Sequence, residues 1–255
     1  MELTYKHTYF LTAGECNAES RMPVTLLTAR IIEVATEHAN ALNVGWARLK
    51  PMGIGWVLSG LTVEMDRWPG INETYTLTTW VEDFNRLYSD RCFEVADGEG
   101  RVIGHVRSLW VAIDLEKRTA ADLSVLEPGQ FVSNTGRCPL PRRQKLPAVT
   151  LEQATLVEDY TYRYCDIDFN GHVNTVRHIE HVLNLWGPEM YAATPVRTMQ
   201  IQFLHECRYG ERVSLQAVET PGDGQTAAQA LVSAVVDGER RVAAKIVFAR
   251  GGEGK

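Results

Sequence analysis

The stretch Asp168-Phe169-Asn170-Gly171-His172-Val173-Asn174 sets a carboxylate, an amide and an imidazole two residues apart, directly before a helical pattern. Apolar side chains then recur along residues 175–186 with the 3.6-residue period of a helix: Val176, Ile179, Leu183 and Trp186. In an extended stretch the side chains at 168, 170 and 172 would project to one side. Asn174 suits the N-cap. The pattern therefore predicts a polar site at the start of a helix.

The same residue types also have ordinary structural uses. Asp and Asn before a helix most often form turns and caps, and a histidine in such a loop is usually a solvated or hydrogen-bonded structural group. Taken alone, the stretch indicates a site without naming its reaction.

Working outward, the chain repeats one order of elements. Each half is expected to have an opening strand, a polar loop, an amphipathic helix and several alternating strands. The expected helices are 23–41 and 175–186, and the expected strands are 4–10, 56–65, 75–84, 87–96, 102–114, 154–164, 197–206, 212–219, 226–236 and 241–249. This order predicts an α+β protein, each half an antiparallel sheet wrapped around one long helix, and it indicates an internal duplication.

A segment rich in proline and basic residues lies near the middle of the chain and is expected to be an exposed connector. It gives predicted boundaries of 1–133 for an N-terminal domain, 134–150 for the linker and 151–255 for a C-terminal domain. A shift of 150 positions places Ala18, Ser20 and Met22 opposite the polar residues 168, 170 and 172. On this comparison only the second half carries the polar stretch, which favours a functional role over a turn-forming one.

Composition excludes several classes of protein. The net charge of −6, from 26 basic and 32 acidic residues, argues against nucleic acid as a partner. No apolar run is long enough to cross a membrane, and the first residues lack the pattern of a secretory signal, so a cytoplasmic location is expected. An acidic protein partner remains open, with a candidate basic patch at Arg137, Arg142, Arg143 and Lys145.

Cysteine usage points to reduced thiols, because the five cysteines are odd in number and form no C-x-x-C pair. No cofactor and no metal are expected. A site of His172, His178 and His181 is disfavoured, because polar residues spaced like the last two usually form the solvent face of a helix.

Several motifs together resemble the acyl-acyl carrier protein thioesterases, in a bacterial form. In the first half they are Gly55-Trp56-Val57-Leu58, Asp66-Arg67-Trp68-Pro69, Thr79-Trp80-Val81 and Ser108-Leu109-Trp110-Val111, and in the second the stretch 166–174 and His205-Glu206-Cys207. The resemblance implies a tandem (double) hotdog fold. It also implies hydrolysis of the thioester between a fatty acyl chain and the phosphopantetheine arm of acyl carrier protein.

The catalytic positions that the resemblance implies are Asp168, Asn170, His172 and Glu206, with Asn174 and Cys207 as supporting positions. Glu206 with His172 is expected to activate water, and Asn170 to polarise the reacting groups. Asp168 would orient the amide and the ring, and backbone N–H groups at the start of the second helix would hold the oxyanion. A Cys207 nucleophile ranks below activated water.

Thr175 and His178 depart from the family pattern, which often has Asn and Tyr there, and are expected to affect helix packing. The alternatives are an acyl-coenzyme A thioesterase of the same fold, a non-catalytic acyl-binding hotdog protein and, less favoured, a hotdog dehydratase. The first half is expected to bind the acyl chain. Chain length, the choice of carrier and the oligomeric state, a homodimer included, are left open.

Overall fold

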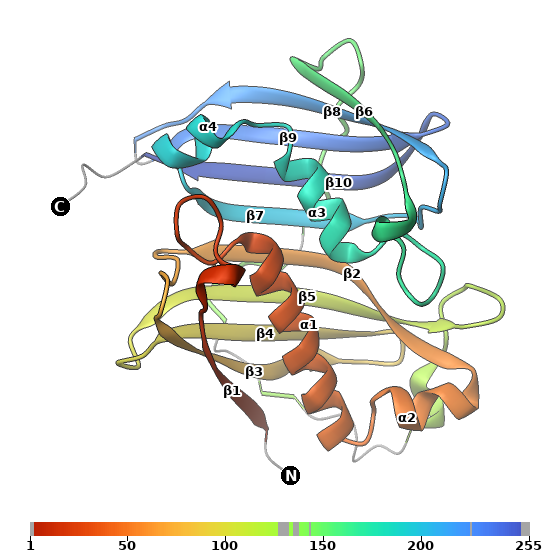
Figure 1. Cartoon of the computed structure of the whole chain (residues 1–255). Helices are drawn as coiled ribbons and strands as arrows, with labels where there is room; N and C mark the ends of the chain where they lie inside the picture. The colour runs from red at the N-terminus through yellow and green to blue at the C-terminus, as the bar shows by residue number, and fades with distance from the viewer. Residues whose placement is uncertain (1–2, 127–132, 135–137, 143, 225, 251–255) are drawn as a thin grey trace. The chain divides into compact units, whose positions relative to one another are not determined.

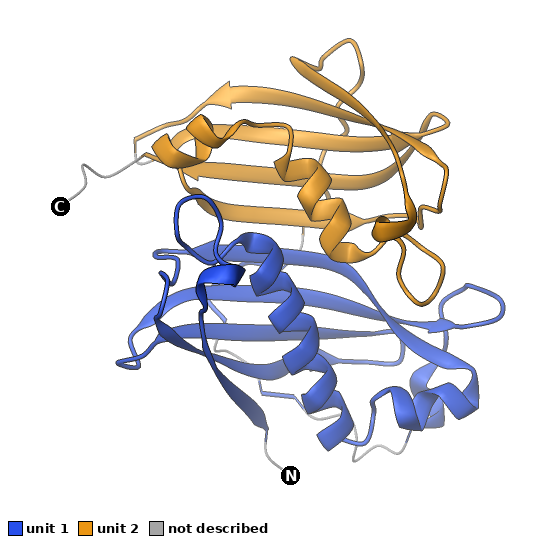
Figure 2. Cartoon of the chain, in the orientation of Figure 1, with its two compact units in different colours: residues 1–142 blue, residues 143–255 orange. Residues whose placement is uncertain are grey.

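The computed structural model describes residues 3–126, 133–134, 138–142, 144–224 and 226–250. The chain divides into two compact units, residues 1–142 and 143–255, as Figure 2 shows. The division falls within the segment expected to be a connector.

Unit 1 is an antiparallel sheet with one long helix on it. The sheet order is β1(Thr4–Phe10)-β3(Thr74–Phe84)-β4(Tyr88–Asp97)-β5(Val102–Asp114)-β2(Ile54–Met65). The helix α1(Val24–Ala41) crosses one face of the sheet (Figure 1) and buries Leu27, Ile31 and Val34. A further core lies where α2(Trp46–Leu49) packs, with Leu42, Val44, Leu49, Ile54, Val81, Ala112, Ala121, Leu123 and Leu126.

Unit 2 repeats this topology. Its sheet order is β6(Leu156–Thr161)-β8(Arg212–Pro221)-β9(Thr226–Val236)-β10(Glu239–Ala249)-β7(Val196–Phe203). The helix α3(Thr175–Leu183) lies across one face of this sheet, and α4(Pro188–Ala193) follows it (Figure 1). In both units the first strand pairs with the third, and the second strand forms the opposite edge of that unit's sheet. This shared order supports the predicted duplication, and each unit is a hotdog module.

The predicted strands agree with the observed ones to within a few residues. The helices differ more. The helix expected at 175–186 ends at Leu183, because the following Gly187-Pro188 pair disfavours helical backbone, and the short α2 and α4 were missed. Asp237-Gly238 forms the expected hairpin turn, with positive φ at both residues. No helix among the described residues has the length and apolar character needed to cross a lipid bilayer.

Most of the described residues of the connector are exposed, as expected, but three apolar side chains in it are buried: Leu140, Leu146 and Val149. The Leu140 carbonyl accepts a bond from Arg107 Nε at 3.2 Å, and the Val149 N–H donates to Ser233 Oγ at 2.9 Å. Of the suggested basic patch, the residues at 137 and 143 lie outside the described residues, and Arg142 contacts Asp83 at 3.4 Å.

Candidate active site

The loop before α3 is a tight turn, and the expected extended stretch was wrong. The Asp168 N–H donates to the His172 carbonyl at 2.8 Å, and the Gly171 N–H donates back to the Asp168 carbonyl at 3.0 Å. Gly171 has φ of +79°, a left-handed conformation that suits glycine. The backbone therefore folds over itself between residues 168 and 172.

The Asp168 carboxylate stabilises this turn. Its Oδ1 accepts the N–H groups of Asn170, at 2.8 Å, and of His172, at 3.3 Å. The amide of Asn170 lies 3.5 Å from the other carboxylate oxygen, on the exposed tip of the loop. Asp168 thus fixes the backbone that carries the other two polar side chains.

His172 and Glu206 meet although they lie far apart in the sequence. His172 Nε2 is 3.0 Å from Glu206 Oε2, with the imidazole 16% exposed and the carboxylate 40% exposed. Glu206 follows β7, and the Val173 N–H donates to the Cys207 carbonyl at 2.8 Å. That backbone bond fastens the two loops together beside the side-chain pair.

This pair can exchange a proton with water. A carboxylate that holds an imidazole orients the ring and stabilises its charged form, as in an acid–base dyad. Since the carboxylate is partly exposed, a water molecule can reach it directly.

Asn174 caps α3 as predicted, since its Oδ1 accepts the Val176 N–H at 2.8 Å. The cap orders the first helical turn, whose N–H groups carry the positive end of the helix dipole. An oxyanion placed there would be stabilised by the groups that the cap does not use.

Cys207 is fully buried. Burial raises the pKa of its thiol to about 11, against a smaller lowering by a hydrogen bond with Tyr162. A thiol with that pKa remains protonated at neutral pH and is a poor nucleophile. The geometry supports the lower rank given to covalent catalysis.

His178 and His181 do not form a solvent face, so that interpretation was wrong. His178 is buried with its Nδ1 3.3 Å from the Tyr162 hydroxyl, and the His181 side chain is 12% exposed with its Nε2 3.1 Å from Asp166 Oδ1. Burial lowers the pKa of His178 to about 4, with a further lowering by His181. Both rings face the sheet of unit 2 and its Tyr side chains.

Unit 1 contains the same turn. There the Asn17 N–H donates to the Arg21 carbonyl at 2.9 Å, the Arg21 N–H donates to Asn17 Oδ1 at 2.9 Å, and the Ser20 N–H donates to the Asn17 carbonyl at 3.0 Å. These bonds reproduce those of Asp168, Gly171 and His172 with a difference of 151 in residue number, 168 − 17. Ser20 even shares the positive φ, +57°.

The comparison at a shift of 150 was therefore wrong by one residue. At the correct register Asn17 stands opposite Asp168, so the turn and its Asx side chain belong to the fold of both units. A comparison made one position off this register hides the equivalence.

What distinguishes unit 2 is the pair of side chains that the turn displays. Arg21 stands where unit 2 has His172. Trp68 stands where unit 2 has Glu206, since the Met22 N–H bonds the Pro69 carbonyl just as the Val173 N–H bonds that of Cys207. Trp68 is buried, 8% exposed. The acid–base pair is thus an addition to a shared scaffold.

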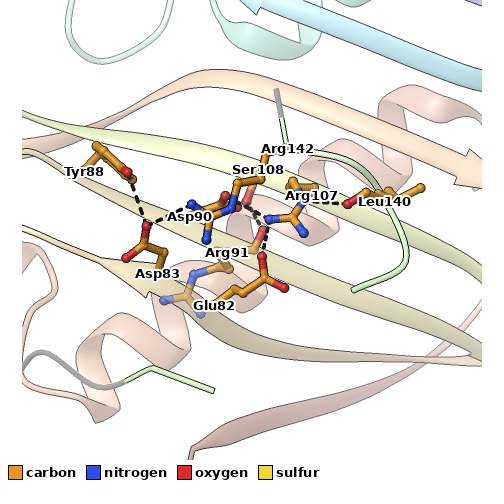
Figure 3. A network of polar contacts seen from close by, with 9 residues as sticks. All are labelled: Glu82, Asp83, Tyr88, Asp90, Arg91, Arg107, Ser108, Leu140 and Arg142. Atoms are coloured by element: carbon orange, nitrogen blue, oxygen red, sulfur yellow. Dashed lines mark hydrogen bonds and ion pairs between the residues drawn. The ribbon is translucent and has the colours of Figure 1, made fainter. Parts of the chain in front are cut away.

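A buried charged cluster in unit 1 was missed by sequence reasoning (Figure 3). Arg107 Nη1 donates to Glu82 at 2.5 Å and to Asp90 Oδ2 at 2.9 Å, with all three side chains at most 10% exposed. Glu82 sits at a β-bulge between β3 and β4, which re-aims its side chain. A bulge of this kind leaves no reliable mark in the sequence.

One group of possible metal ligands occurs among the described residues: Glu82, Asp90 and Cys92, whose ligand atoms lie within 4.8 Å of one another. Arg107 already supplies positive charge to both carboxylates. The cluster is a buried ion-pair network in which one cation faces two carboxylates, and it contains none of the sequence-predicted site residues.

Comparison with known proteins places both units in one family. The acyl-ACP thioesterase N-terminal domain model matches residues 2–125, and the C-terminal domain model matches residues 150–250. The matches cover most of both units.

The curated relatives are plant proteins. An acyl-[acyl-carrier-protein] hydrolase of Cuphea viscosissima is 24% identical over 236 residues, 87% of this chain and 57% of that protein. An oleoyl-acyl carrier protein thioesterase of Coriandrum sativum is 23% identical over 240 residues, 87% of this chain and 64% of that protein. The chain therefore spans somewhat more than half the length of these relatives.

Solved structures share the whole fold. An acyl-ACP thioesterase from Bacteroides thetaiotaomicron has a TM-score of 0.85 at 29% identity, covering 96% of this chain and 97% of that one. A 12:0-ACP thioesterase from Umbellularia californica has a TM-score of 0.86 at 16% identity, covering 98% and 95%. A MaoC-like dehydratase, at 9% identity and a TM-score of 0.65, covers 98% of both chains and shares the fold alone.

Proposed function

The chain belongs to the acyl-ACP thioesterase family, and from that premise we propose that it hydrolyses fatty acyl-acyl carrier protein to a free fatty acid and the carrier protein. The observation that carries the proposal is the contact of His172 Nε2 with Glu206 Oε2 at 3.0 Å, on a loop framework that unit 1 shares without the pair. The catalytic unit is unit 2, and unit 1 is assigned to binding of the acyl chain. The proposed N-terminal domain is 1–133, the linker is 134–150 and the C-terminal domain is 151–255.

The reaction needs an activated water and a held oxyanion. Glu206 and His172 together remove a proton from water as its oxygen attacks the thioester carbonyl carbon. The carbonyl electrons move onto oxygen, and N–H groups at the start of α3 hold that negative charge. When the carbonyl re-forms, the carbon–sulfur bond breaks, and the carrier thiolate takes the proton from the imidazole.

Asn170 and Asp168 have distinct roles in this scheme. The Asn170 amide lies at the exposed loop tip, where it can donate to the substrate carbonyl or to water. Asp168 acts through the turn, by fixing the N–H groups of Asn170 and His172. The burial of Cys207 leaves water as the nucleophile.

The test compares hydrolysis of each acyl chain on two different carriers. Purified protein would be given acyl chains of graded length attached to acyl carrier protein and to coenzyme A, with free fatty acid as the readout. Faster release from the carrier protein is expected. Faster release from coenzyme A would favour the acyl-CoA thioesterase alternative.

A Glu206→Gln variant gives the matched control, since it keeps the shape of the side chain without its charge. Acyl binding without release by the parent protein would support the non-catalytic acyl-binding alternative instead. Equal release by parent and variant would remove the assignment of the acid–base pair.

A further inference from the structure

Asp166 holds both ends of the loop that carries His172. It is the last residue of the 3-10 turn η5(Tyr164–Asp166), and its carbonyl accepts the N–H of Asn174 at 2.8 Å. Residues 167 and 173 form an isolated bridge just inside that bond. The loop is therefore closed at its base by the backbone of Asp166.

The Asp166 side chain in turn joins the strand and the helix on either side. Its Oδ2 accepts the Arg163 N–H at 2.7 Å and the Tyr160 hydroxyl at 3.0 Å, while its Oδ1 lies 3.1 Å from His181 Nε2 on α3. The two side chains are 7% and 12% exposed. Motion of this carboxylate would move the base of the loop.

Unit 1 has an equivalent carboxylate with a different side-chain partner. Glu15 Oε2 accepts the Thr12 N–H at 2.9 Å, and Glu15 Oε1 accepts from Arg30 Nη2 at 2.8 Å. Arg30 lies 4.6 Å from the centre of the Tyr9 ring, as the His181 ring lies 4.0 Å from that of Tyr160. The numbers again differ by 151: 15 and 166, 30 and 181, 9 and 160.

The two units differ in the side chain that meets this carboxylate, an arginine in unit 1 and a histidine in unit 2. An arginine offers a carboxylate several N–H donors in one planar group, whereas a histidine ring offers at most two. In unit 2 a single ring nitrogen of His181 therefore makes the contact with Asp166.

We propose that Asp166 and His181 are positioning residues for thioester hydrolysis, and that their contact tightens the loop that places His172 against Glu206. This rests on the proposed function of the same site.

The position of the loop affects the rate through the distance between His172 and Glu206. His172 contacts Glu206 at 3.0 Å, which leaves little room for displacement of the loop. Displacement of a reacting group by about 1 Å can cost on the order of 100-fold in rate. A loosened base at Asp166 therefore reduces turnover more than substrate binding.

Several ionisable groups surround the Asp166–His181 contact. Burial raises the pKa of Tyr160 and of Tyr162 on or next to β6, so both stay neutral. Burial raises the pKa of Asp166, but hydrogen bonds from Arg163, Tyr160 and His181 outweigh it and hold the pKa below its usual range. Other ionisable groups nearby lie on η5 and on α3. Cys165 belongs to η5, and on α3 Arg177 pairs with Glu180. His178, also on α3, has a pKa of about 4 and is neutral at neutral pH.

The experiment compares His181→Gln and His181→Arg with the parent, measuring kcat and KM with an acyl carrier protein substrate. For His181→Gln we expect kcat about tenfold lower, the size of one lost charged hydrogen bond, with KM little changed. His181→Arg, which offers Asp166 a charged donor as Arg30 does for Glu15, should recover part of that loss.

The control is Arg30→His in unit 1, which changes the equivalent contact away from the acid–base pair and should leave kcat close to that of the parent. An unchanged kcat in His181→Gln, or a change confined to KM, would overturn the proposal.

Amide hydrogen exchange of residues 167–174 gives a readout that does not need catalysis. At a given pH, intrinsic exchange is equal in parent and variant. Lower protection of these amides in His181→Gln supports the proposal, and equal protection overturns it. If the parent releases no fatty acid, the proposed function fails while exchange still reports on the loop.

Discussion

Both units bury charge, and they do so with different partners. In unit 1, Arg107 pairs with Glu82 and Asp90 on the sheet (Figure 3), and Arg30 pairs with Glu15 beside the helix. In unit 2 the equivalent carboxylate Asp166 faces His181, and a second imidazole faces Glu206. Arginine gives a fixed charge, whereas histidine can gain and lose a proton. The two units therefore differ in the residues that pair with their carboxylates more than in their fold.

The largest expected effect is a difference in kcat between substitutions in the equivalent loops of the two units. His172→Ala should lower kcat on the order of 100-fold to 10,000-fold, the range for loss of an acid–base group, with little change in the free energy of unfolding. Arg21→Ala, the equivalent change in unit 1, should leave kcat close to that of the parent. Steady-state hydrolysis of acyl carrier protein substrates measures both. Equal losses in the two variants would contradict the asymmetry.

The next effect is on stability. Arg107→Met should lower the free energy of unfolding by about 3–5 kcal/mol, because Glu82 and Asp90 would remain buried without their cation. The matched control is Arg86→Met, since Arg86 and Asp122 form an exposed pair at 3.9 Å and should matter by less than about 1 kcal/mol. Urea unfolding measures both changes. A small effect at Arg107 would show that the buried carboxylates are not charged.

A third effect appears on acidification. The pKa of His178, about 4, lies below that of an unfolded histidine, so the unfolded state binds the proton first and stability is lost as pH falls from about 6.5 toward 4. The loss should reach roughly 3 kcal/mol near pH 4. His178→Gln should remove it, as followed by thermal unfolding between pH 7 and pH 4.

Unit 1 sharpens this prediction because Leu27 stands at the position equivalent to His178, with the same difference of 151. Acid unfolding followed by segment-resolved hydrogen exchange should therefore begin in unit 2. Loss of protection in α1 before α3 would contradict the assignment.

The smallest effect is expected at Cys207. Cys207→Ala should leave kcat within a few-fold of the parent, because the buried thiol has a pKa of about 11 and takes no covalent part. The same hydrolysis assay measures it. A loss on the order of 100-fold or more would restore the thiol as a nucleophile.

The sequence predicted the elements that leave a periodic pattern of apolar residues. Alternating strands, the two amphipathic helices and the Asn174 cap all follow from local patterns, and strands 102–114 and 226–236 begin and end where predicted. Short helices such as α2 and α4 leave too little periodicity to detect.

The site was partly predictable. The resemblance supplied Glu206 as a partner for His172, and the structure brings them together. The role of Asp168 in the turn could not be read from spacing, because it depends on a backbone that doubles back. The Asp166–His181 contact was missed because it joins a 3-10 turn to a helix face that was expected to be exposed.

Where unit 1 closes its surface with the indole of Trp68, unit 2 leaves a half-hydrated carboxylate. Unit 2 thereby forgoes apolar burial worth roughly 2–3 kcal/mol for a large side chain. Unit 2 should therefore limit the thermal stability of the chain. Substitutions intended to raise that stability should be placed in unit 2, away from His172 and Glu206.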